Sequence, residues 1–254
     1  VAIAPAVTAS AQDVNGAILS SFTGQVTIAL GTGSGGGAVL SGTRTAAAVD
    51  GVATFSDLRI DRSGPGSTLV ATSPGLGPVT SSSFVVTAGP AAKLVLTTPP
   101  GTTAQIGVPL SPQPVVRIQD AAGNNVSQGG RVIAAAIASG DGTLGGTLTA
   151  NTNSFGVASF TDLKITGAVG TRTLRFTSPG LTDVTSSAIN LTAGPASAMD
   201  VNAGNQQSAT PGAAVAVAPS VIVRDASGNP VSGVAVTFAT PGTSNGSVTN
   251  GAQT

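Results

Sequence analysis

The chain has 254 residues, a net charge of zero and only 8% charged residues. Binding to nucleic acid or to an acidic membrane surface needs clustered Lys and Arg, so the composition excludes both as partners. Cys, His, Trp, Tyr and Glu are absent, which removes the usual general base, the thiol nucleophile and every metal ligand except the carboxylate of Asp.

Segments of the first half return in the second half at one fixed spacing. GVATFSDLRI at residues 51–60 becomes GVASFTDLKI at residues 156–165, so the two segments are 105 positions apart. SPGL, TAGPA and the turn sequence DAxGN recur with the same spacing, at 73 and 178, 87 and 192, and 120 and 225. A constant spacing across four landmarks indicates tandem copies of one domain.

The landmarks divide the chain into three copies. Copy one covers residues 1–88 and lacks its first strand, copy two covers 89–193 and is complete, and copy three covers 194–254 and is truncated at its C-terminal end. We expect an excerpt from a longer array; the alternative is a subunit whose partial copies are completed by neighbours. No signal-peptide pattern occurs at Val1, so any targeting segment is expected outside these residues.

Short stretches of alternating apolar residues, separated by Gly, Pro, Asn and Ser, are typical of an all-β sandwich. In copy two they predict seven strands, at 92–97, 115–119, 131–138, 143–150, 157–165, 171–178 and 186–192. Each copy is therefore expected to be an immunoglobulin-like sandwich of about seven strands. No apolar run approaches the length of a membrane span, so we expect no membrane insertion.

The repeated segment 156–165 changes its alternation phase halfway along. Ala158 and Phe160 share one phase, whereas Leu163 and Ile165 share the other. Copy one breaks phase at the same place. A bulge or bend near Asp57 and Asp162 would keep all of these apolar side chains inside the core.

The junctions between copies are short and contain proline. TAGPA connects the last strand of one copy to the first strand of the next, and Pro90 and Pro195 restrict the backbone there. A proline junction of this length is stiffer than a Gly/Ser linker. We expect a semi-rigid rod of domains whose cores are independent. The Gly-rich residues 31–37 are expected to form a loop insertion in copy one.

The sequence DASGNPVSGVAVTF at residues 225–238 resembles the bacterial immunoglobulin-like domains of the invasin and intimin type. Copy two has a looser version in residues 120–126, GDGTL at 140–144 and NSFGVASF at 153–160. The resemblance implies a stalk of a surface adhesin or giant secreted protein. It also implies a location on the bacterial cell surface or outside the cell, because that is where such stalks work.

The turns 120–125 and 225–229 have two interpretations. Oxygen-rich turns suit a hard cation such as calcium. The alternative is an Asx-type turn, in which Asp and Asn bond their own backbone and Gly supplies a positive φ. One carboxylate per turn favours the second interpretation, so no metal ligand is assigned.

Other candidate sites have equally plain explanations. Asp57 and Asp61, near Asp50 and Arg59, suggest a carboxylate pair, but copy two has Thr166 in place of Asp61. Residues 140–142 and 31–37 lack the helix start that a phosphate loop requires, so we expect hairpin turns.

Two further residue types were weighed as modification sites. An isopeptide crosslink would need a buried lysine, and Lys93 and Lys164 are expected to be ordinary exposed cations. The glycosylation patterns at Asn125, Asn190 and Asn245 are as many as chance produces. We therefore assign no catalytic and no cofactor-binding residues.

The sequence thus predicts a non-catalytic structural stalk or spacer, adhesin-like and secreted or surface-attached, whose partners are the neighbouring copies. Interface hot spots favour Trp, Tyr and Arg, and two of these are absent. The alternative is a self-assembling filament or sheath subunit that pairs through the strand edges of its partial copies. A carbohydrate-binding module is a weaker option, because the chain has few aromatic residues for stacking on sugars.

Overall fold

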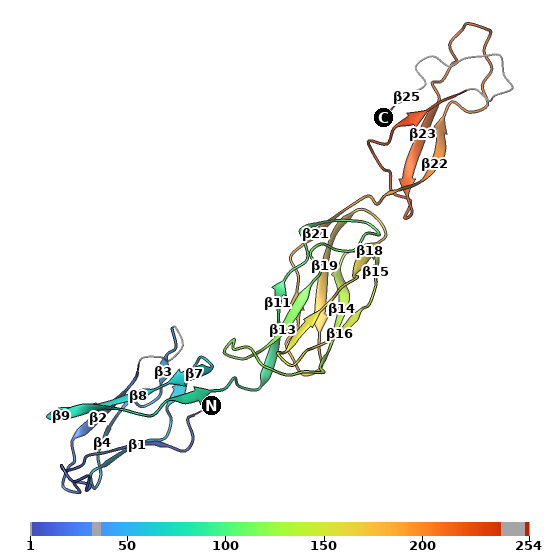
Figure 1. Ribbon diagram of the computed structural model, residues 1–254. Helices are drawn as coiled ribbons and strands as arrows, with labels where there is room; N and C mark the ends of the chain where they lie inside the picture. The colour runs from blue at the N-terminus through green and yellow to red at the C-terminus, as the bar shows by residue number, and fades with distance from the viewer. Residues whose placement is uncertain (1, 32–36, 240–251, 254) are drawn as a thin grey trace. The chain divides into compact units, whose positions relative to one another are not determined.

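The computed structural model describes residues 2–31, 37–239 and 252–253. Every regular element within these residues is a β-strand (Figure 1), which confirms the predicted all-β class. No helix in the described part of the chain is long and apolar enough to cross a membrane. The chain forms two compact units, residues 1–93 with 118–127 and residues 94–117 with 128–254. The boundaries of the three copies stay a prediction.

The strands are short throughout. Copy one contains β1 (Val7–Ser10), β2 (Gln25–Leu30), β3 (Leu40–Ser41), β4 (Thr45–Ala47), β5 (Val52–Phe55), β6 (Arg59–Ile60), β7 (Gly64–Ser67), β8 (Leu69–Ser73), β9 (Leu76–Thr80) and β10 (Phe84–Val86). Copy two contains β11 (Ala91–Thr98), β12 (Thr103–Gln105), β13 (Val115–Asp120), β14 (Val132–Ser139), β15 (Thr143–Gly145), β16 (Thr149–Asn151), β17 (Val157–Ser159), β18 (Lys164–Thr166), β19 (Gly170–Thr177), β20 (Val184–Thr185) and β21 (Ile189–Thr192). Copy three contains β22 (Ala196–Ala203), β23 (Ser220–Asp225), β24 (Val236–Thr237) and β25 (Ala252–Gln253).

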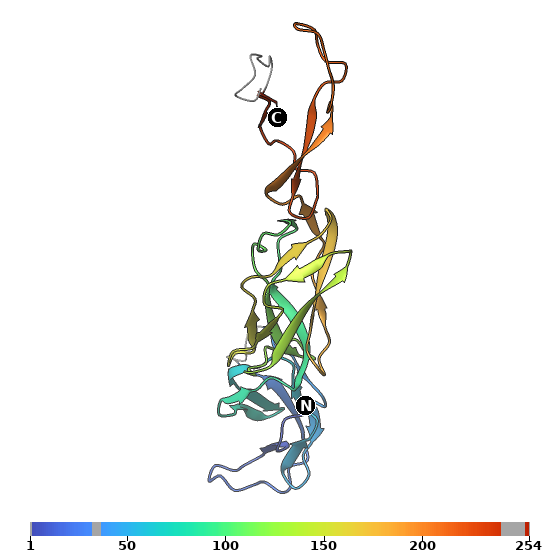
Figure 2. The same ribbon diagram turned by 90° about the vertical axis from the view of Figure 1, so that its right-hand side faces the viewer.

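Copy two is a sandwich of two principal sheets. One has the strand order β11-β13-β17 and the other β12-β21-β19-β14-β16, with β20 added to β19. The ring of Phe160, which follows β17, packs against the ring of Phe176 on β19 and so joins the two sheets. The strands of this copy are green to orange in Figures 1 and 2.

Copy one repeats this arrangement with one strand fewer. β1 pairs with β5 as β13 pairs with β17, and β4-β2-β8-β9 forms the second sheet. In the described residues of copy one, nothing corresponds to β11 of copy two. That copy one lacks its first strand stays a prediction.

Most predicted strands of copy two are present, and three are altered. The expected strand 143–150 is interrupted after Gly145, where Gly146 adopts a φ of 92° that ends the extended conformation. The expected strand 186–192 shortens to β21, and the expected strand 157–165 divides into β17 and β18. Neither β12 nor β20 was expected, because their two or three residues are too short to show a pattern.

The predicted bend in the repeated segment is confirmed. β17 ends at Ser159 and β18 begins at Lys164, and between them the chain moves from the strand β13 to the strand β15. Ala158, Phe160 and Leu163 are all buried on the two sides of the bend. The change of phase therefore lets a single segment pair with two different strands while Ala158, Phe160, Leu163 and Ile165 all stay buried.

A carboxylate fixes this bend in both copies. Asp162 accepts hydrogen bonds from the backbone N–H of Thr147 at 2.8 Å and from its hydroxyl at 3.1 Å. Asp57 makes the same two bonds with Thr43, at 2.9 and 3.0 Å. These Asp side chains hold the bend against the segment that connects β15 to β16, or β3 to β4 in copy one, which explains why an acid recurs at this position.

Buried and exposed residues alternate along β19 and β21 of copy two. Leu174 and Phe176 are fully buried in β19, and the Arg175 between them is exposed. In β21, Ile189 and Leu191 are buried. Copy one has its own apolar core, formed by Val26, Ile28, Leu40, Ala48, Ala53, Phe55, Leu58 and Leu69.

Copy three differs from the other two. Its strands β22 and β23 pair along their length, but β22 is exposed at every residue except Ala203, which is half-buried. In the described part of copy three no apolar side chain is buried, whereas Asp225 and Asn229 are. Its buried side chains are therefore polar, and they lie in the turn after β23.

Candidate functional site: the Asp–Asn turns

The same turn follows corresponding strands of copies two and three, and we call residues 120–124 and 225–229 the Asp–Asn turns. In copy two, the N–H of Asp120 donates to the carbonyl of Asn124 at 2.9 Å, and Gly123 has a φ of 93°. In copy three, the N–H of Asp225 donates to the carbonyl of Asn229, also at 2.9 Å. Glycine suits this position because an L side chain is strained at such a φ.

The aspartate of each turn organises the backbone around it. Oδ1 of Asp120 accepts from the backbone N–H of Asn124 at 2.8 Å, and Oδ1 of Asp225 accepts from the N–H of Asn229 at 2.9 Å. In copy three, the backbone N–H of Ser227 also donates to Oδ1 of Asp225, at 2.8 Å. The Asx-type turn is therefore confirmed.

The second carboxylate oxygen holds the proline junction. Oδ2 of Asp120 accepts from the backbone N–H of Gly89 at 2.8 Å. Oδ2 of Asp225 accepts from the N–H of Gly194 at 2.7 Å. Both glycines belong to the TAGPA junctions, so each turn is tied to the segment that leads into its own copy.

These contacts set the charge state of the two acids. Burial raises the pKa of Asp225, but hydrogen bonds from the side chain of Asn229 and from the N–H groups of Gly194, Asn229 and Ser227 outweigh it and lower the pKa to about 2. Burial likewise raises the pKa of Asp120, and the bonds from Asn124 and Gly89 leave it below its usual value. Both carboxylates are ionised at neutral pH.

The asparagine of each turn also reaches a loop of the preceding copy. Nδ2 of Asn124 donates to the carbonyl of Asp61, and Oδ1 accepts from the N–H of Ser63, both at 2.9 Å. Nδ2 of Asn229 donates to the carbonyl of Gly167 at 2.9 Å, and Oδ1 accepts from the N–H of Val169 at 3.1 Å. The same pair of bonds therefore occurs at both junctions.

The calcium interpretation of the turns does not fit these contacts. Each carboxylate accepts bonds from N–H donors on both oxygens, and the amide oxygen of each Asn is also occupied. A bound calcium ion requires about six oxygen ligands directed at one point. In the described residues, no group of three or more Asp side chains is placed to hold a metal ion.

The structure gives structural roles to the remaining acidic candidates. Asp57 binds Thr43, and its pKa is lowered chiefly by the backbone N–H of that residue. Asp61 accepts instead from the backbone N–H of Val39 at 2.7 Å. The two carboxylates are thus held by separate partners.

Other expected features are changed or lie elsewhere. Residues 140–142 form a turn, but it connects β14 and β15, which pair with strands of different sheets, so the expected hairpin is wrong. Lys164 is exposed as expected, whereas Lys93 is half-buried. Most of the Gly-rich loop 31–37 and Asn245 lie outside the described residues.

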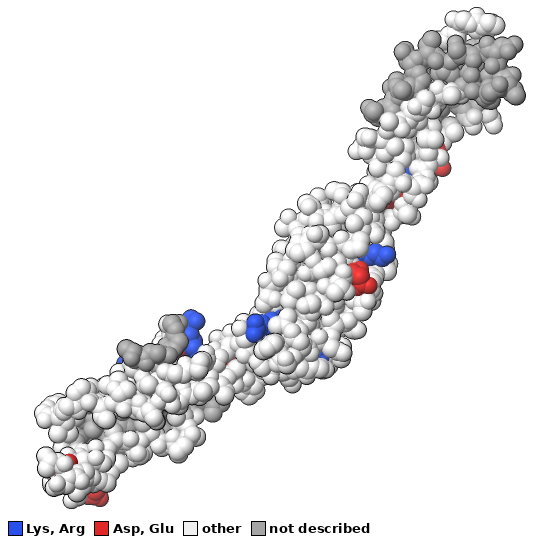
Figure 3. Space-filling model, in the orientation of Figure 1, with Lys and Arg blue, Asp and Glu red and all other residues white. Residues whose placement is uncertain are grey.

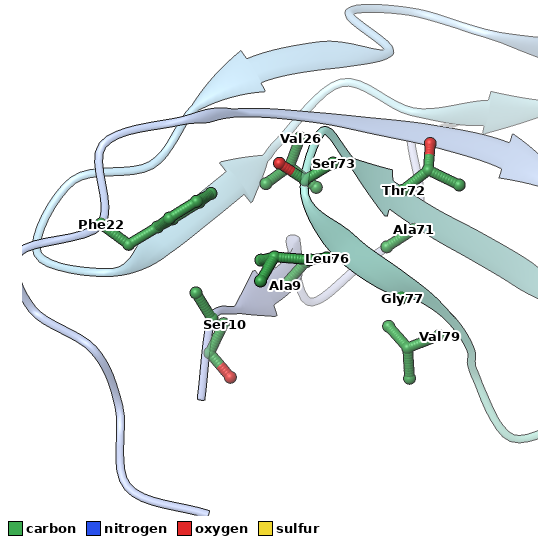
Figure 4. A pocket seen from close by; sticks show the side chains of 11 residues that line it. Ala9, Ser10, Phe22, Val26, Ala71, Thr72, Ser73, Leu76, Gly77 and Val79 are labelled. Atoms are coloured by element: carbon green, nitrogen blue, oxygen red, sulfur yellow. The ribbon is translucent and has the colours of Figure 1, made fainter. Parts of the chain in front are cut away.

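A depression in copy one is the other candidate site (Figure 4). It lies between β1, β2, β8 and β9, and its lining includes Phe22, Ala71 and Leu76. Ala71 stands 105 positions before Phe176, whose ring is fully buried in copy two. The space is therefore explained by the missing phenyl ring in copy one, and no charged side chain lines it.

Sequence reasoning missed that the two junction glycines belong to the turns. TAGPA and DAxGN were interpreted separately, as a stiff connection and as a turn. The signal was available, because Gly89 precedes Asp120 by 31 residues and Gly194 precedes Asp225 by the same number. Two landmarks that keep their mutual spacing in every copy are candidates for direct contact.

No family model matches the chain, and no curated protein matches its sequence. Among solved structures, a β-glycosidase from Bacteroides vulgatus is similar at 11% identity and a TM-score of 0.35, over 66% of this chain and 21% of that one. The D0–D1 domain of intimin is similar at 17% identity and a TM-score of 0.30, over 74% and 90% of the two chains. Domains 1–6 of the surface layer protein SbsC are similar at 16% identity and a TM-score of 0.25, over 92% and 29%.

The chain spans about a fifth of the β-glycosidase and under a third of the SbsC segment. All three TM-scores lie below 0.5. The β-sandwich assignment rests on the strands and their pairing in this chain.

Proposed function

We propose that the chain is a non-catalytic structural segment, a stalk or spacer, of an extracellular bacterial repeat protein. The proposal rests on which residues and contacts repeat between the copies. Phe55 and Phe160 are buried at corresponding positions, and the bend acids Asp57 and Asp162 and the Asp–Asn turns recur with the same hydrogen bonds. Each of them stabilises the fold or a junction, so shape is what has been retained.

The surface supports the same proposal. Charged side chains are few and scattered on the face shown in Figure 3. Many of the large exposed apolar side chains are valines, such as Val85 at 66% and Val201 at 61% exposure. Energetically dominant interface residues are usually Trp, Tyr and Arg in desolvated pockets. A surface of this kind suits a spacer better than an adhesive tip.

The carboxylates also argue against hydrolytic chemistry. A general acid near neutral pH needs a raised pKa. Among the described residues, the pKa values that are shifted, at Asp57, Asp120 and Asp225, are all lowered. The hydrogen bonds that lower these pKa values serve the bend and the turns.

The extracellular bacterial setting follows from the resemblance of residues 225–238 to invasin- and intimin-type domains. A cysteine-free chain is compatible with that setting, because export does not require disulfides. Sandwich domains with separate cores give a spacer that unfolds one domain at a time under load.

Sedimentation velocity of the purified chain at micromolar concentration tests the proposal. A spacer segment sediments as a monomer at every concentration. Concentration-dependent growth into large species would contradict the proposal and favour the filament or sheath subunit. A glycan array run on the same material addresses the carbohydrate-binding option, for which the spacer proposal expects no specific binding.

A further inference from the structure

The asparagine side chain of the turn has a task that the turn itself does not need. Copy one contains the same Asx-type turn at residues 13–17, where Oδ1 of Asp13 accepts from the N–H of Asn15 and from the N–H of Ala17, both at 2.9 Å. Ala17 occupies the position of Asn124 and Asn229, four residues after the aspartate. The turn therefore forms with alanine there. The amide of the other two copies donates to the aspartate of its own turn, and it also makes a contact that Ala17 cannot make.

That contact is with a loop of the preceding copy. The carboxamide of Asn229 is used on both sides, as donor to the carbonyl of Gly167 and as acceptor from Val169. Ser227 adds a bond of 3.3 Å from the N–H of Gly167 to its hydroxyl. An amide offers a donor and an acceptor side by side, which matches a backbone carbonyl and N–H two residues apart.

The receiving loop of copy two is itself held in place. Arg172 is buried, and its guanidinium donates to the carbonyls of Ala168 and Thr171, both at 2.9 Å. Fixing the loop in advance lowers the entropy that is lost when it binds the turn.

The burial of two polar residues in copy three also indicates a contact with the preceding copy. Asp225 and Asn229 are buried although no described apolar side chain of copy three is. Their burial is supplied by the junction and by the loop 167–169 of copy two. Buried polar groups must be hydrogen-bonded, and the carboxamide of Asn229 bonds both to Asp225 of its own turn and to Gly167 and Val169 of the preceding copy.

We infer that Asn124 and Asn229 are positioning residues that couple each copy to the one before it, through an acceptor loop at residues 61–63 of copy one and 167–169 of copy two. The inference rests on the proposed spacer function and adds the contact that limits motion at each junction. Its partner is the Asp–Asn turn of a following copy. Copy one has no such amide, because Ala17 stands in its place.

The absence of cysteine from the chain makes paired spin labelling a direct test at the second junction. Val132→Cys on β14 and Val201→Cys on β22 replace exposed side chains. With labels at these positions, double electron–electron resonance on the full chain is expected to give one narrow distance distribution. Asn229→Ala is expected to broaden it. The matched control is Asn202→Ala, which removes an exposed amide that donates to the hydroxyl of Ser220 in the same copy.

Amide hydrogen exchange tests the first junction, where copy one has a core of its own. Asn124→Ala is expected to speed exchange at Ser63, whose N–H donates to the lost Oδ1, and to leave the core amides of copy one unchanged. Asn125→Ala, which removes the neighbouring exposed amide, is expected to leave Ser63 unchanged.

Unchanged exchange at Ser63 in Asn124→Ala would overturn the inference. So would a distribution that is equally wide in wild type and Asn229→Ala, or equal broadening in Asn202→Ala. None of these outcomes depends on whether the chain sediments as a monomer, so the coupling and the spacer function can fail separately.

Discussion

Phe160 and Phe176 join the two sheets of copy two, with ring centroids 5.3 Å apart and ring planes inclined by 54°. Tilted aromatic pairs at this distance contribute beyond the area that they bury. Copy one retains the first ring as Phe55 but has Ala71 in place of the second. The missing ring at position 71 is therefore one difference between the cores of two parallel domains.

Truncating the core of copy two is expected to destabilise that copy alone. Phe160→Ala or Leu174→Ala should cost about 3–4 kcal/mol, because a large buried side chain is lost and a cavity remains. The chain has no Trp or Tyr, so exchange of backbone amides, resolved by copy, is the suitable measurement. Phe155→Ala is the control, since this ring is 65% exposed. A single cooperative transition shared by copies one and two would contradict independent cores.

Restoring the missing ring is expected to stabilise copy one. Ala71→Phe places a phenyl group toward the depression of Figure 4 and should raise the stability of copy one by about 1 kcal/mol through apolar burial. The reciprocal Phe176→Ala in copy two should cost about 3–5 kcal/mol. Thermal unfolding followed by far-UV circular dichroism measures both changes.

The control for the filled depression is Val85→Phe, at an exposed position of β10 that does not line the depression. It adds the same ring outside the depression and is expected to give no gain. A loss of stability in Ala71→Phe would show that the depression cannot accept the ring.

The fold was predictable wherever local pattern and repetition agreed. Period-two alternation accounts for the burial of Leu174, Phe176 and Leu191, because a strand buries every second side chain. The phase break before Asp162 located the bend between β17 and β18. The split after Gly145 was missed, since the apolar pattern continues across it and the positive φ of Gly146 is visible only in the backbone.

The junction contacts could not be predicted from the strand patterns. Asn229 meets Gly167 across 62 positions of sequence, and nothing in the alternation of either segment indicates the pairing. The turn sequence itself indicated the Asx geometry but left calcium open. Only the donors around Asp225 decide between the two, because they occupy the oxygens that a cation would need.

Acid is expected to weaken copy three through Asp225. Its folded pKa of about 2 lies below the ordinary value of 3.8, so the ionised form contributes stability above about pH 4, and this stability is lost as the pH falls towards about 2. Asp225→Asn should remove this dependence and lower the stability of the junction at pH 7. Amide exchange at Gly194, whose N–H donates to this carboxylate, measured across that pH range, is the readout.

The control for the acid effect is Asp141→Asn, in the turn between β14 and β15, where the side chain is exposed. It should leave the pH profile of Gly194 exchange unchanged. A profile in Asp225→Asn that still falls between pH 4 and pH 2 would assign the acid sensitivity to another group.

Calcium is expected to leave the chain's stability unchanged. The oxygens of Asp120 and Asp225 already accept N–H bonds from Gly89, Gly194 and their own turns, so a cation would have to displace them to bind. A ligand that binds only the folded state raises its stability with concentration. Thermal unfolding in millimolar calcium and in excess chelator should therefore give the same midpoint. A midpoint that rises with calcium and is restored by the chelator would mean that the turns open to coordinate the ion, and Asp225→Asn would then abolish part of that rise.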